Sequence, residues 1–396
     1  MKHKILILLI AACFLSVSLW AGGFGLTLEQ TAGVSGDGDE SFFDYSAFLV
    51  PRFSTYWGAN NGLYISAGIN ADYLDKEWTF APELLRTELY LRFGGWALTA
   101  GRMYYSDPLG YIAEGLFDGG QLSFDSTVGT FNIGAWYTGL LYKTRAGIAM
   151  TPKEQEALTA KLDYSDFANT YFAPRRLVAA LGWENPSLFS YLMAKFAVLG
   201  QFDVSSQGSN GGLNSQYFAG SLSLPLKSFI FDLGGCLELL QADDSGMAFA
   251  GDFGILWMLP SNFPSRLKFL ARYASGETGS VDAFLPVTSR AQGNVFKPGL
   301  SGLSLFSLDY AAQFHPAFSF DLSSTYFIRN DKYTYSSLGD EGYFLGNEFF
   351  GRLVWCPVSD LQFVLGAGAF LPSMGNVAPD GKSIWRVELN VFFSLY

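Results

Sequence analysis

The chain ends in the stretch Ile384-Trp385-Arg386-Val387-Glu388-Leu389-Asn390-Val391-Phe392-Phe393-Ser394-Leu395, whose side chains alternate in character. Successive side chains of a β-strand point to opposite faces of its sheet. One face of this strand carries Arg386, Glu388 and Asn390. The strand therefore meets water on that face and an apolar environment on the other, which is formed by Trp385, Val387, Leu389, Val391, Phe393 and Leu395.

The composition of the whole chain extends this pattern. Hydrophobic residues make up 49% and aromatic residues 17% of the sequence, with 37 Phe and 21 Tyr, whereas charged residues make up 15%. Soluble domains carry roughly 25% charged residues. A transmembrane β-barrel uses such a composition, because lipid covers one face of every strand and aromatic rings gather at both membrane interfaces. The net charge of -11 argues against a nucleic-acid partner.

The first residues have the pattern of a secretory signal. Residues 1–4 are basic, residues 5–20 are apolar apart from two serines, and small residues follow at 21–23. We therefore expect a cleaved signal peptide at 1–21 and one exported domain at 22–396. A rival interpretation takes Ile10-Ala11-Ala12-Cys13 as a lipobox, with Cys13 lipidated. Beyond the signal, no run of about 18 apolar residues predicts a transmembrane helix.

Hydrophobic alternation between turn signals predicts about 16 to 18 strands, with 18 preferred. Connectors after even-numbered strands are short, such as 94–95 and 315–316, whereas those after odd-numbered strands are mostly long, such as 34–42, 75–82, 106–120 and 276–302. An up-and-down meander places alternate connectors at opposite ends of the sheet, and outer-membrane barrels have short periplasmic turns and long external loops. We predict an all-β, closed antiparallel transmembrane barrel. It has no plug domain, because its first strand begins directly after the signal.

Charged residues within the strands predict an aqueous lumen. In residues 83–93, Arg86, Glu88 and Arg92 alternate with apolar side chains. An outward Arg or Lys at the bilayer midplane would cost about 2 to 4 kcal/mol, so we expect these charges to face water. They could form cross-strand salt bridges or filter solutes by charge. Arg102 fits neither face, which predicts a local bulge. The other predicted lumen residues are Glu348, Arg352, Arg386 and Glu388.

The third long connector, residues 106–120, is apolar for a surface loop. It contains Leu109, Ile112, Leu116 and Phe117, together with the acidic residues Asp107, Glu114 and Asp118. Apolar side chains in a loop favour burial, so this loop either folds into the barrel or packs on its own rim. We take it as the candidate constriction.

In this loop the chain resembles porins of the general and substrate-preferring kinds, whose third loop folds inward as an acidic constriction. The segment Gly101-Arg102, followed by Asp107 and Asp118-Gly119, is faintly similar to alginate-export-type and phosphate-type channels. The resemblance implies an outer-membrane channel with Asp107, Glu114 and Asp118 at its narrowest point.

The fourth loop carries a helix signal. Thr151-Pro152-Lys153-Glu154 is a capping box with proline at the first helical position, which predicts a short helix over the mouth, through Leu162. This helix could be a lid or a surface helix. The acidic loop tips at 37–40, 243–244 and 340–341 lack the spacing of a calcium loop and are interpreted as solvated surface, with no metal site. Cys236 and Cys356 are expected to be separate packing residues.

These observations favour a porin-like channel for passive diffusion of small hydrophilic solutes. The alternatives are a surface-exposed adhesion or ligand-binding barrel without an open pore and a transporter of hydrophobic compounds. An enzyme is not expected, because the chain has no CxxC, HExxH, GxSxG or P-loop spacing and His315 lies in a tight turn away from the loops. No cofactor or catalytic residue is predicted. The expected partners are outer-membrane lipid, small solutes and the barrel-assembly machinery through the C-terminal strand, and a homotrimer is left open.

Overall fold

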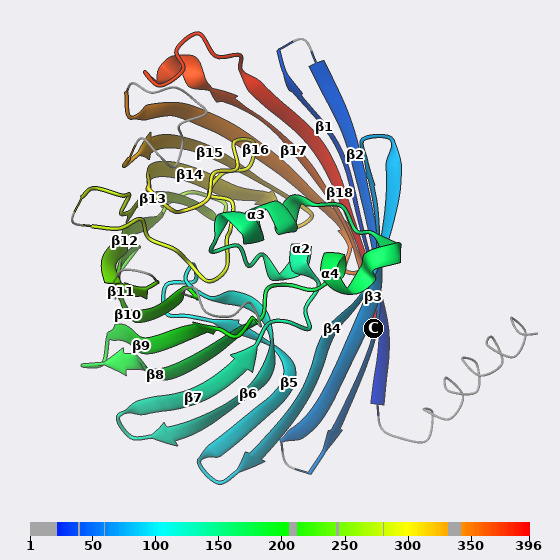
Figure 1. Ribbon diagram of the computed structural model, residues 1–396, viewed down its shortest axis with the longest axis vertical. Coiled ribbons are helices and arrows are strands. Elements are labelled where there is room, and N and C mark those ends of the chain that lie inside the picture. The colour runs from blue at the N-terminus through cyan, green and yellow to red at the C-terminus, as the bar shows by residue number, and fades with distance from the viewer. Residues whose placement is uncertain are drawn as a thin grey trace, which may run out of the picture.

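The protein is a closed barrel of eighteen antiparallel strands, each paired with its neighbour in sequence, and the first strand pairs with the last (Figure 1). The computed structural model describes residues 22–38, 40–58, 60–205, 212–242, 245–279, 281–331 and 342–396. The predicted signal at 1–21, with Cys13, lies outside the described residues, as do Asp39, Asp243, Asp244, Asp340 and Glu341 of the acidic tips.

The strands have the following bounds. They are β1 (Gly22–Asp37), β2 (Glu40–Trp57), β3 (Asn61–Leu74), β4 (Glu77–Phe93), β5 (Trp96–Ser106), β6 (Glu114–Ser126), β7 (Gly129–Tyr137), β8 (Arg176–Leu188), β9 (Leu192–Asp203), β10 (Asn214–Leu226), β11 (Phe229–Gln241), β12 (Ser245–Met258), β13 (Ser265–Ala274), β14 (Leu303–His315), β15 (Phe318–Arg329), β16 (Phe344–Val358), β17 (Leu361–Leu371) and β18 (Ile384–Leu395).

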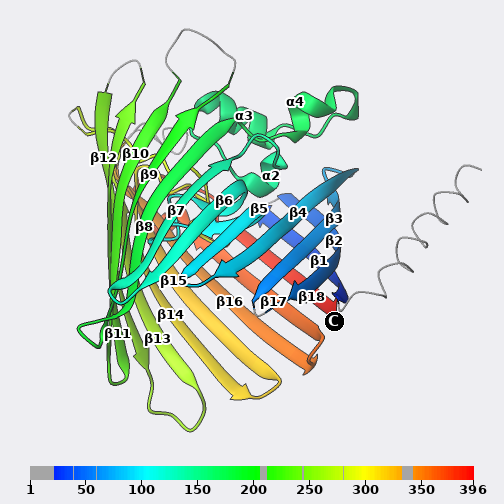
Figure 2. The same cartoon turned by 90° about the horizontal axis from the view of Figure 1, so that it is seen from below.

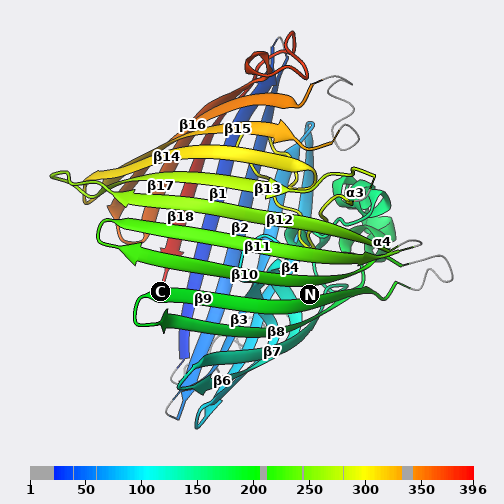
Figure 3. The same cartoon turned by 90° about the vertical axis from the view of Figure 1, so that its left-hand side faces the viewer.

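Among the described residues, short helices lie in two of the connectors at the loop end. The fourth loop, between β7 and β8, holds α2 (Lys143–Ala146), α3 (Pro152–Thr159), η2 (Tyr164–Asp166) and α4 (Phe167–Tyr171), and η4 (Pro372–Met374) follows β17. Figures 2 and 3 show these helices at one end of the barrel and the tight turns at the other. In the part of the chain that the structure describes, no helix has the length and apolarity to cross a membrane.

The predicted number of strands is confirmed, but several strands extend further towards the loop end than predicted. Residues 77–82 and 114–120, expected as loops, belong to β4 and β6, and the predicted long loop at 34–42 is mostly strand. The glycines of β6 caused one of these errors. A Cβ atom on Gly119 would lie 2.1 Å from the carbonyl oxygen of Ala135, so glycine is there to let β7 approach and not to make a turn.

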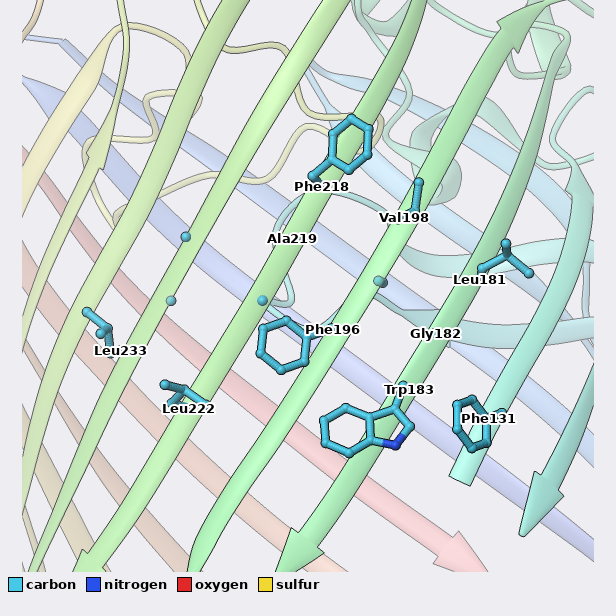
Figure 4. A pocket seen from close by; sticks show the side chains of 14 residues that line it. Phe131, Leu181, Gly182, Trp183, Phe196, Val198, Phe218, Ala219, Leu222 and Leu233 are labelled. Atoms are coloured by element: carbon cyan, nitrogen blue, oxygen red, sulfur yellow. The ribbon is translucent and has the colours of Figure 1, made fainter. Parts of the chain in front are cut away.

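The outer face of the barrel is apolar and carries a girdle of aromatic rings near the tight turns. Trp355 lies between Phe318 and Phe363 of the adjoining strands, with ring centroids 6.0 and 5.2 Å apart. Between β11 and β12, Phe229 stacks on Trp257 at 5.7 Å. A large concavity, about 800 Å³, also lies on this outer wall over β7–β11, where Figure 4 shows its aromatic and aliphatic lining. This exterior is suited to lipid, so the concavity is not on a path for hydrophilic solutes.

The inner face near the closing strands is polar, as the terminal stretch predicts. Arg386 of β18 donates two hydrogen bonds of 2.9 Å to Asp44 of β2 and one of 2.8 Å to Glu388. Asn390 accepts a hydrogen bond of 2.6 Å from Thr31 of β1. The polar face of β18 therefore points into the barrel and helps to hold its closing seam.

Candidate channel lumen and constriction

The interior of the barrel is divided into two halves at the level of the loops. We call the inner wall of β6–β13 the covered half, because Trp136, Tyr217 and Glu238 on it are at most 2% exposed. The inner wall of β14–β18 and β1–β5 is the open half, where the side chains of Arg86 and Arg352 are 41% and 40% exposed. At the loop end of β14–β17 this half is covered too, since Leu303, Phe327 and Phe370 are at most 3% exposed and residues 295 and 296 pack against them. Since inward side chains reach water only in a hollow interior, the open half lines a wet lumen.

The third loop folds inward around one carboxylate. Asp107 accepts hydrogen bonds of 2.8 to 3.0 Å from four backbone N–H groups of the same loop, and its side chain is buried. Burial raises the pKa of Asp107, and the hydrogen bonds to the ionised carboxylate oppose this shift. The carboxylate of Asp107 therefore stabilises the folded form of the loop. The four donors are Leu109, Gly110, Ile112 and Ala113.

The seventh loop, residues 275–302, crosses the interior between two buried glutamates. Glu238 of β11 accepts a hydrogen bond of 2.8 Å from the backbone N–H of Leu285, and the hydroxyl of Tyr217 donates to the carbonyl of Leu285 at 2.6 Å. Glu348 of β16 holds the other side of the loop, because it accepts hydrogen bonds of 2.8 to 2.9 Å from the N–H groups of residues 294–296. The loop is thus anchored to the wall at both sides of the barrel.

The third, fourth and seventh loops are joined through their backbones. The N–H of Thr288 donates to the carbonyl of Ile112 at 3.1 Å, and the hydroxyl of Thr288 accepts from the N–H of Glu114 at 3.0 Å. The N–H of Ser289 donates to the carbonyl of Gly147 in the fourth loop at 2.7 Å. The three loops therefore form one continuous layer across part of the lumen.

A row of small residues on the barrel wall leaves room for this layer of loops. The register of six neighbouring strands places one small residue on the inner face of each at the same level. Buried side chains of the loops, among them Ile112 and Phe284, belong to the same hydrophobic cluster as five of the six. A wall of larger residues would fill the space that the loops occupy. The small-residue row is Gly182, Ala197, Ala219, Cys236, Ala250 and Ala274.

Enlarging one member of this row is expected to displace the loop layer. Ala219→Leu adds three carbon atoms under the seventh loop, and overpacking of this kind typically costs about 1 to 3 kcal/mol. We expect faster hydrogen exchange in residues 107–113 and 284–288, measured by mass spectrometry. Ala271→Leu, on the outer face of β13, is the matched control and should leave both segments unchanged. Equal exchange in the two variants would contradict a supporting role for the row.

The predicted constriction residues fall into two groups. Those of the first group are buried loop anchors or lie on β6, and those of the second lie on the open half of the wall. Asp107 and Glu348 are buried anchors of the loops, so neither presents its charge to the lumen as the sequence indicated. Asp118 lies on β6, not in a loop, and pairs with Arg102. Glu114 is also on β6, and it binds the hydroxyl of Tyr104 and lies 3.3 Å from Arg290.

The other predicted residues lie on the open half and are paired. Arg86 binds Glu88, Arg92 lies 2.9 Å from Asp125, and Arg352 lies 3.9 Å from Asp321. Together with Arg386, Asp44 and Glu388 they give the lumen wall a lattice of both charges. The salt-bridge interpretation therefore describes their geometry, and the exposure of Arg86, Arg92 and Arg352 still leaves these charges in contact with water.

Arg102 has a special position in the wall. Gly101 before it has φ +112°, and the pairing of β5 with β4 ends at Ala100. The guanidinium turns into the gap that this leaves, where it makes two hydrogen bonds of 2.7 Å to Asp118 and one of 2.5 Å to the carbonyl of Leu84. The bulge predicted at Arg102 is not what the structure shows: here the backbone pairing of β4 with β5 ends and the two strands diverge.

The fourth loop is anchored by the capping box that the sequence predicts. The hydroxyl of Thr151 accepts from the N–H of Glu154, and the carboxylate of Glu154 accepts from the N–H of Thr151 at 3.0 Å. Glu154 also binds the buried guanidinium of Arg176 of β8 at 2.7 Å. Helix α3 is therefore confirmed and is tied to the barrel wall.

The inward course of the seventh loop was not predicted from the sequence. The sequence carries one signal of its burial, the apolar residues Phe284, Leu285 and Val287. The small-residue row that faces them is apparent only once the register of the strands is known. The two cysteines in the described part of the chain are free, with Cys236 buried in the row and Cys356 exposed. Among the described residues, no group of three or more His, Cys, Asp or Glu side chains is arranged to hold a metal ion.

Comparison with solved structures identifies the architecture. The barrel matches crystal structures of the Pseudomonas aeruginosa proteins OccK9 (OpdG), with a TM-score of 0.64, 12% identity and coverage of 95% of this chain and 98% of that one, and OprD, with a TM-score of 0.62, 11% identity and 95% coverage of both. The outer membrane protein opdK from the same organism matches with a TM-score of 0.62, 12% identity and coverage of 94% and 98%. The fold is that of the OprD-type barrels. Likeness at this level of identity shows the fold alone.

No protein-family model matches the chain, and the comparison with curated proteins gives no match. The similarity to alginate-export-type and phosphate-type channels is not confirmed, since the matched structures named above are of the OprD type.

Proposed function

We propose that the protein is an outer-membrane channel for passive diffusion of small hydrophilic solutes, narrowed by the third and seventh loops. The observation that carries the proposal is the division of the interior. One half is filled by loops that are anchored to the wall, while the other, beyond the covered loop ends of β14–β17, is lined by water-accessible ion pairs. A barrel of about eighteen strands is wide enough to leave an aqueous passage.

The geometry supports a simple mechanism. A solute entering from the loop end would pass between the loop layer and the open half of the wall. Arg86, Arg352 and Arg386 there are each next to a carboxylate, so a polar solute could exchange its hydration for contacts with either charge. The loop layer narrows the passage and is held by backbone hydrogen bonds, so its position does not depend on flexible side chains at the rim.

The same proposal covers the location and the partners. The apolar exterior and the aromatic girdle require lipid around the barrel, and the resemblance in fold to OprD-type barrels supports the outer membrane. Export would depend on the signal predicted at 1–21, and assembly on recognition of β18. Sedimentation of the purified protein would distinguish a monomer from a homotrimer.

Conductance in planar bilayers tests the proposal. The exported chain, 22–396, should insert and give ohmic steps, and liposomes that contain it should swell faster in isotonic small sugars than liposomes without it. A barrel that inserts with correct folding but neither conducts nor accelerates swelling would rule out the channel and favour an adhesion or ligand-binding barrel. Folding is checked beforehand by the heat-dependent shift of mobility in detergent gels.

A further inference from the structure

The barrel wall is interrupted between β4 and β5. These strands pair only from Phe93–Trp96 to Leu89–Ala100, at the end with the tight turns. Beyond that point, residues 77–88 of β4 form no backbone ladder with β5, although they remain paired with β3. Arg102 of β5 bridges the two strands through hydrogen bonds to the hydroxyl of Thr87 and the carbonyl of Leu84. Figures 1 and 2 show the helices of the fourth loop beside the loop end of β4. The wall therefore has a side opening towards the loop end, which we call the split.

Side chains bind the free edge of β4 in place of a neighbouring strand. The hydroxyl of Tyr164 accepts from the N–H of Phe80 at 3.0 Å and donates to its carbonyl, and the hydroxyl of Tyr171 donates to the carbonyl of Pro82 at 2.5 Å. Pro82 itself has no N–H group to donate, and proline is typical of strand edges. The split is thus closed by two tyrosines of the fourth loop, which can leave without breaking a backbone ladder.

Aromatic rings continue from this edge into the barrel. The ring of Tyr171 lies between Phe167 and Tyr142, with centroids 4.5 and 4.9 Å away. Outside the split, Phe80, Leu84 and Leu140 are about half exposed and present an apolar approach from the membrane side. Removal of the stacked rings would connect this outer surface with the interior.

A cavity of about 350 Å³ lies on the inner side of these rings. Tyr142 and Phe48 form part of its lining, and its charged lining residues are Glu29, Asp72, Glu83 and Arg145. Arg145 is paired with Glu83 at 2.9 Å and lies 4.6 Å above the ring of Phe48. Within the described ranges, Glu29 and Asp72 have no cation within 4.0 Å, so the cavity carries excess negative charge beside aromatic rings. Such a cavity favours an organic cation.

We propose that the split is a lateral portal, with the fourth loop as its door, through which cationic amphiphiles pass between the membrane and the lumen. The ammonium head would occupy the cavity beside Glu29 and Asp72, and the apolar tail would lie in the split along Leu84 and Leu140. This inference rests on the proposed placement of the barrel in a membrane but not on conduction along its axis. The portal opens when Tyr164 and Tyr171 release the edge of β4. Arg102 keeps β4 and β5 linked nearer the tight turns.

Cysteine labelling in phosphatidylcholine vesicles tests the portal. Ser46→Cys reports on the cavity and Ser323→Cys on the open half far from the split, each in a background carrying Cys236→Ala and Cys356→Ser. The door is loosened by Tyr164→Phe with Tyr171→Phe. A hexadecyl maleimide dissolved in the bilayer should then label Ser46→Cys roughly tenfold faster, as expected from the loss of the two hydroxyls that bind the edge. Labelling of Ser323→Cys should not change.

Controls separate a portal from general loosening. Tyr191→Phe removes a hydroxyl from a tyrosine at the turn end that is as exposed as Tyr164, at 58%, and should have no effect. A sulfonated, water-soluble maleimide should label Ser46→Cys at the same rate with and without the door variants. If the double variant folds poorly, Tyr164→Phe alone replaces it. Equal acceleration at both cysteines, or no acceleration at Ser46→Cys, overturns the portal.

A competition experiment tests the charge of the head group. Dodecyltrimethylammonium below its micelle concentration should protect Ser46→Cys from the water-soluble maleimide, and dodecyl sulfate should not. Glu29→Gln with Asp72→Asn should remove the protection. Protection by both amphiphiles, or by neither, overturns the cationic assignment. A barrel that conducts without a labelling difference would refute the portal alone, whereas labelling without conductance would refute the axial channel alone.

Discussion

Replacement of residues 283–298 by a short Gly-Ser linker is expected to raise the single-channel conductance several-fold. This segment of the seventh loop covers the inner wall of β11–β13 and reaches Glu348 on the far side. Its removal should open the covered half to water, so the conducting cross-section would increase. Single-channel recording in planar bilayers measures the change directly.

The control for this prediction is Gln155→Ala with Glu156→Ala on helix α3, because both side chains are exposed and Glu154 keeps its bond to Arg176. Its conductance should stay close to that of the parent. Glu348→Gln is the milder test, because it keeps the shape of the side chain but weakens the hydrogen bonds to residues 294–296. We expect noisier current with an intermediate conductance. An unchanged conductance after the replacement of residues 283–298 would show that the seventh loop does not restrict the lumen.

The second large effect is expected at Arg102. Its buried guanidinium binds Asp118 twice and the carbonyls of Leu84 and Leu140, so Arg102→Ala leaves a carboxylate and two backbone acceptors without their donor. Removal of one member of a buried ion pair typically costs about 3 to 5 kcal/mol. The free energy of unfolding, measured by urea titration in lipid vesicles, should fall by this amount.

Arg92→Ala is the matched control for Arg102→Ala. Arg92 also pairs with an aspartate on β6, but both partners are half exposed. Exposed pairs contribute about 0 to 1 kcal/mol, so this variant should remain near the parent in stability. Equal destabilisation of the two variants would mean that Arg102 does not have a special role at the split.

The sequence predicted the features of the fold that depend on periodicity. The alternation of 384–395 and of 83–93 placed Arg386 and Arg86 inside the barrel, because a one-residue step changes the face of every side chain. The capping box at Thr151 placed helix α3 equally well, since its signal is local. Short stretches of sequence therefore predicted the number of strands, the direction in which each face points and the sites of the tight turns.

The candidate site was harder to predict, because its parts are brought together by register between strands. The inward row that includes Ala197, Ala219 and Ala250 becomes a row only when three hydrogen-bonded neighbours are aligned. Asp107 looks like a charge for the lumen until the fold of its loop directs four N–H groups towards it. Likewise, Pro82 was interpreted as part of a loop, although a strand edge without a neighbour accepts proline.

The seam between β1 and β18 has a consequence for how the barrel forms. Every other strand pair joins neighbours in sequence, but Thr31 and Asn390, which bond across this seam, are 359 positions apart. Contacts between distant segments are slow to form, since the intervening chain must first lose conformational freedom. Until β18 arrives, β1 has an unpaired edge that could pair with another chain. Closure of the seam is therefore the step at which assembly and aggregation compete, and a factor that shields the edge of β1 would decide the yield.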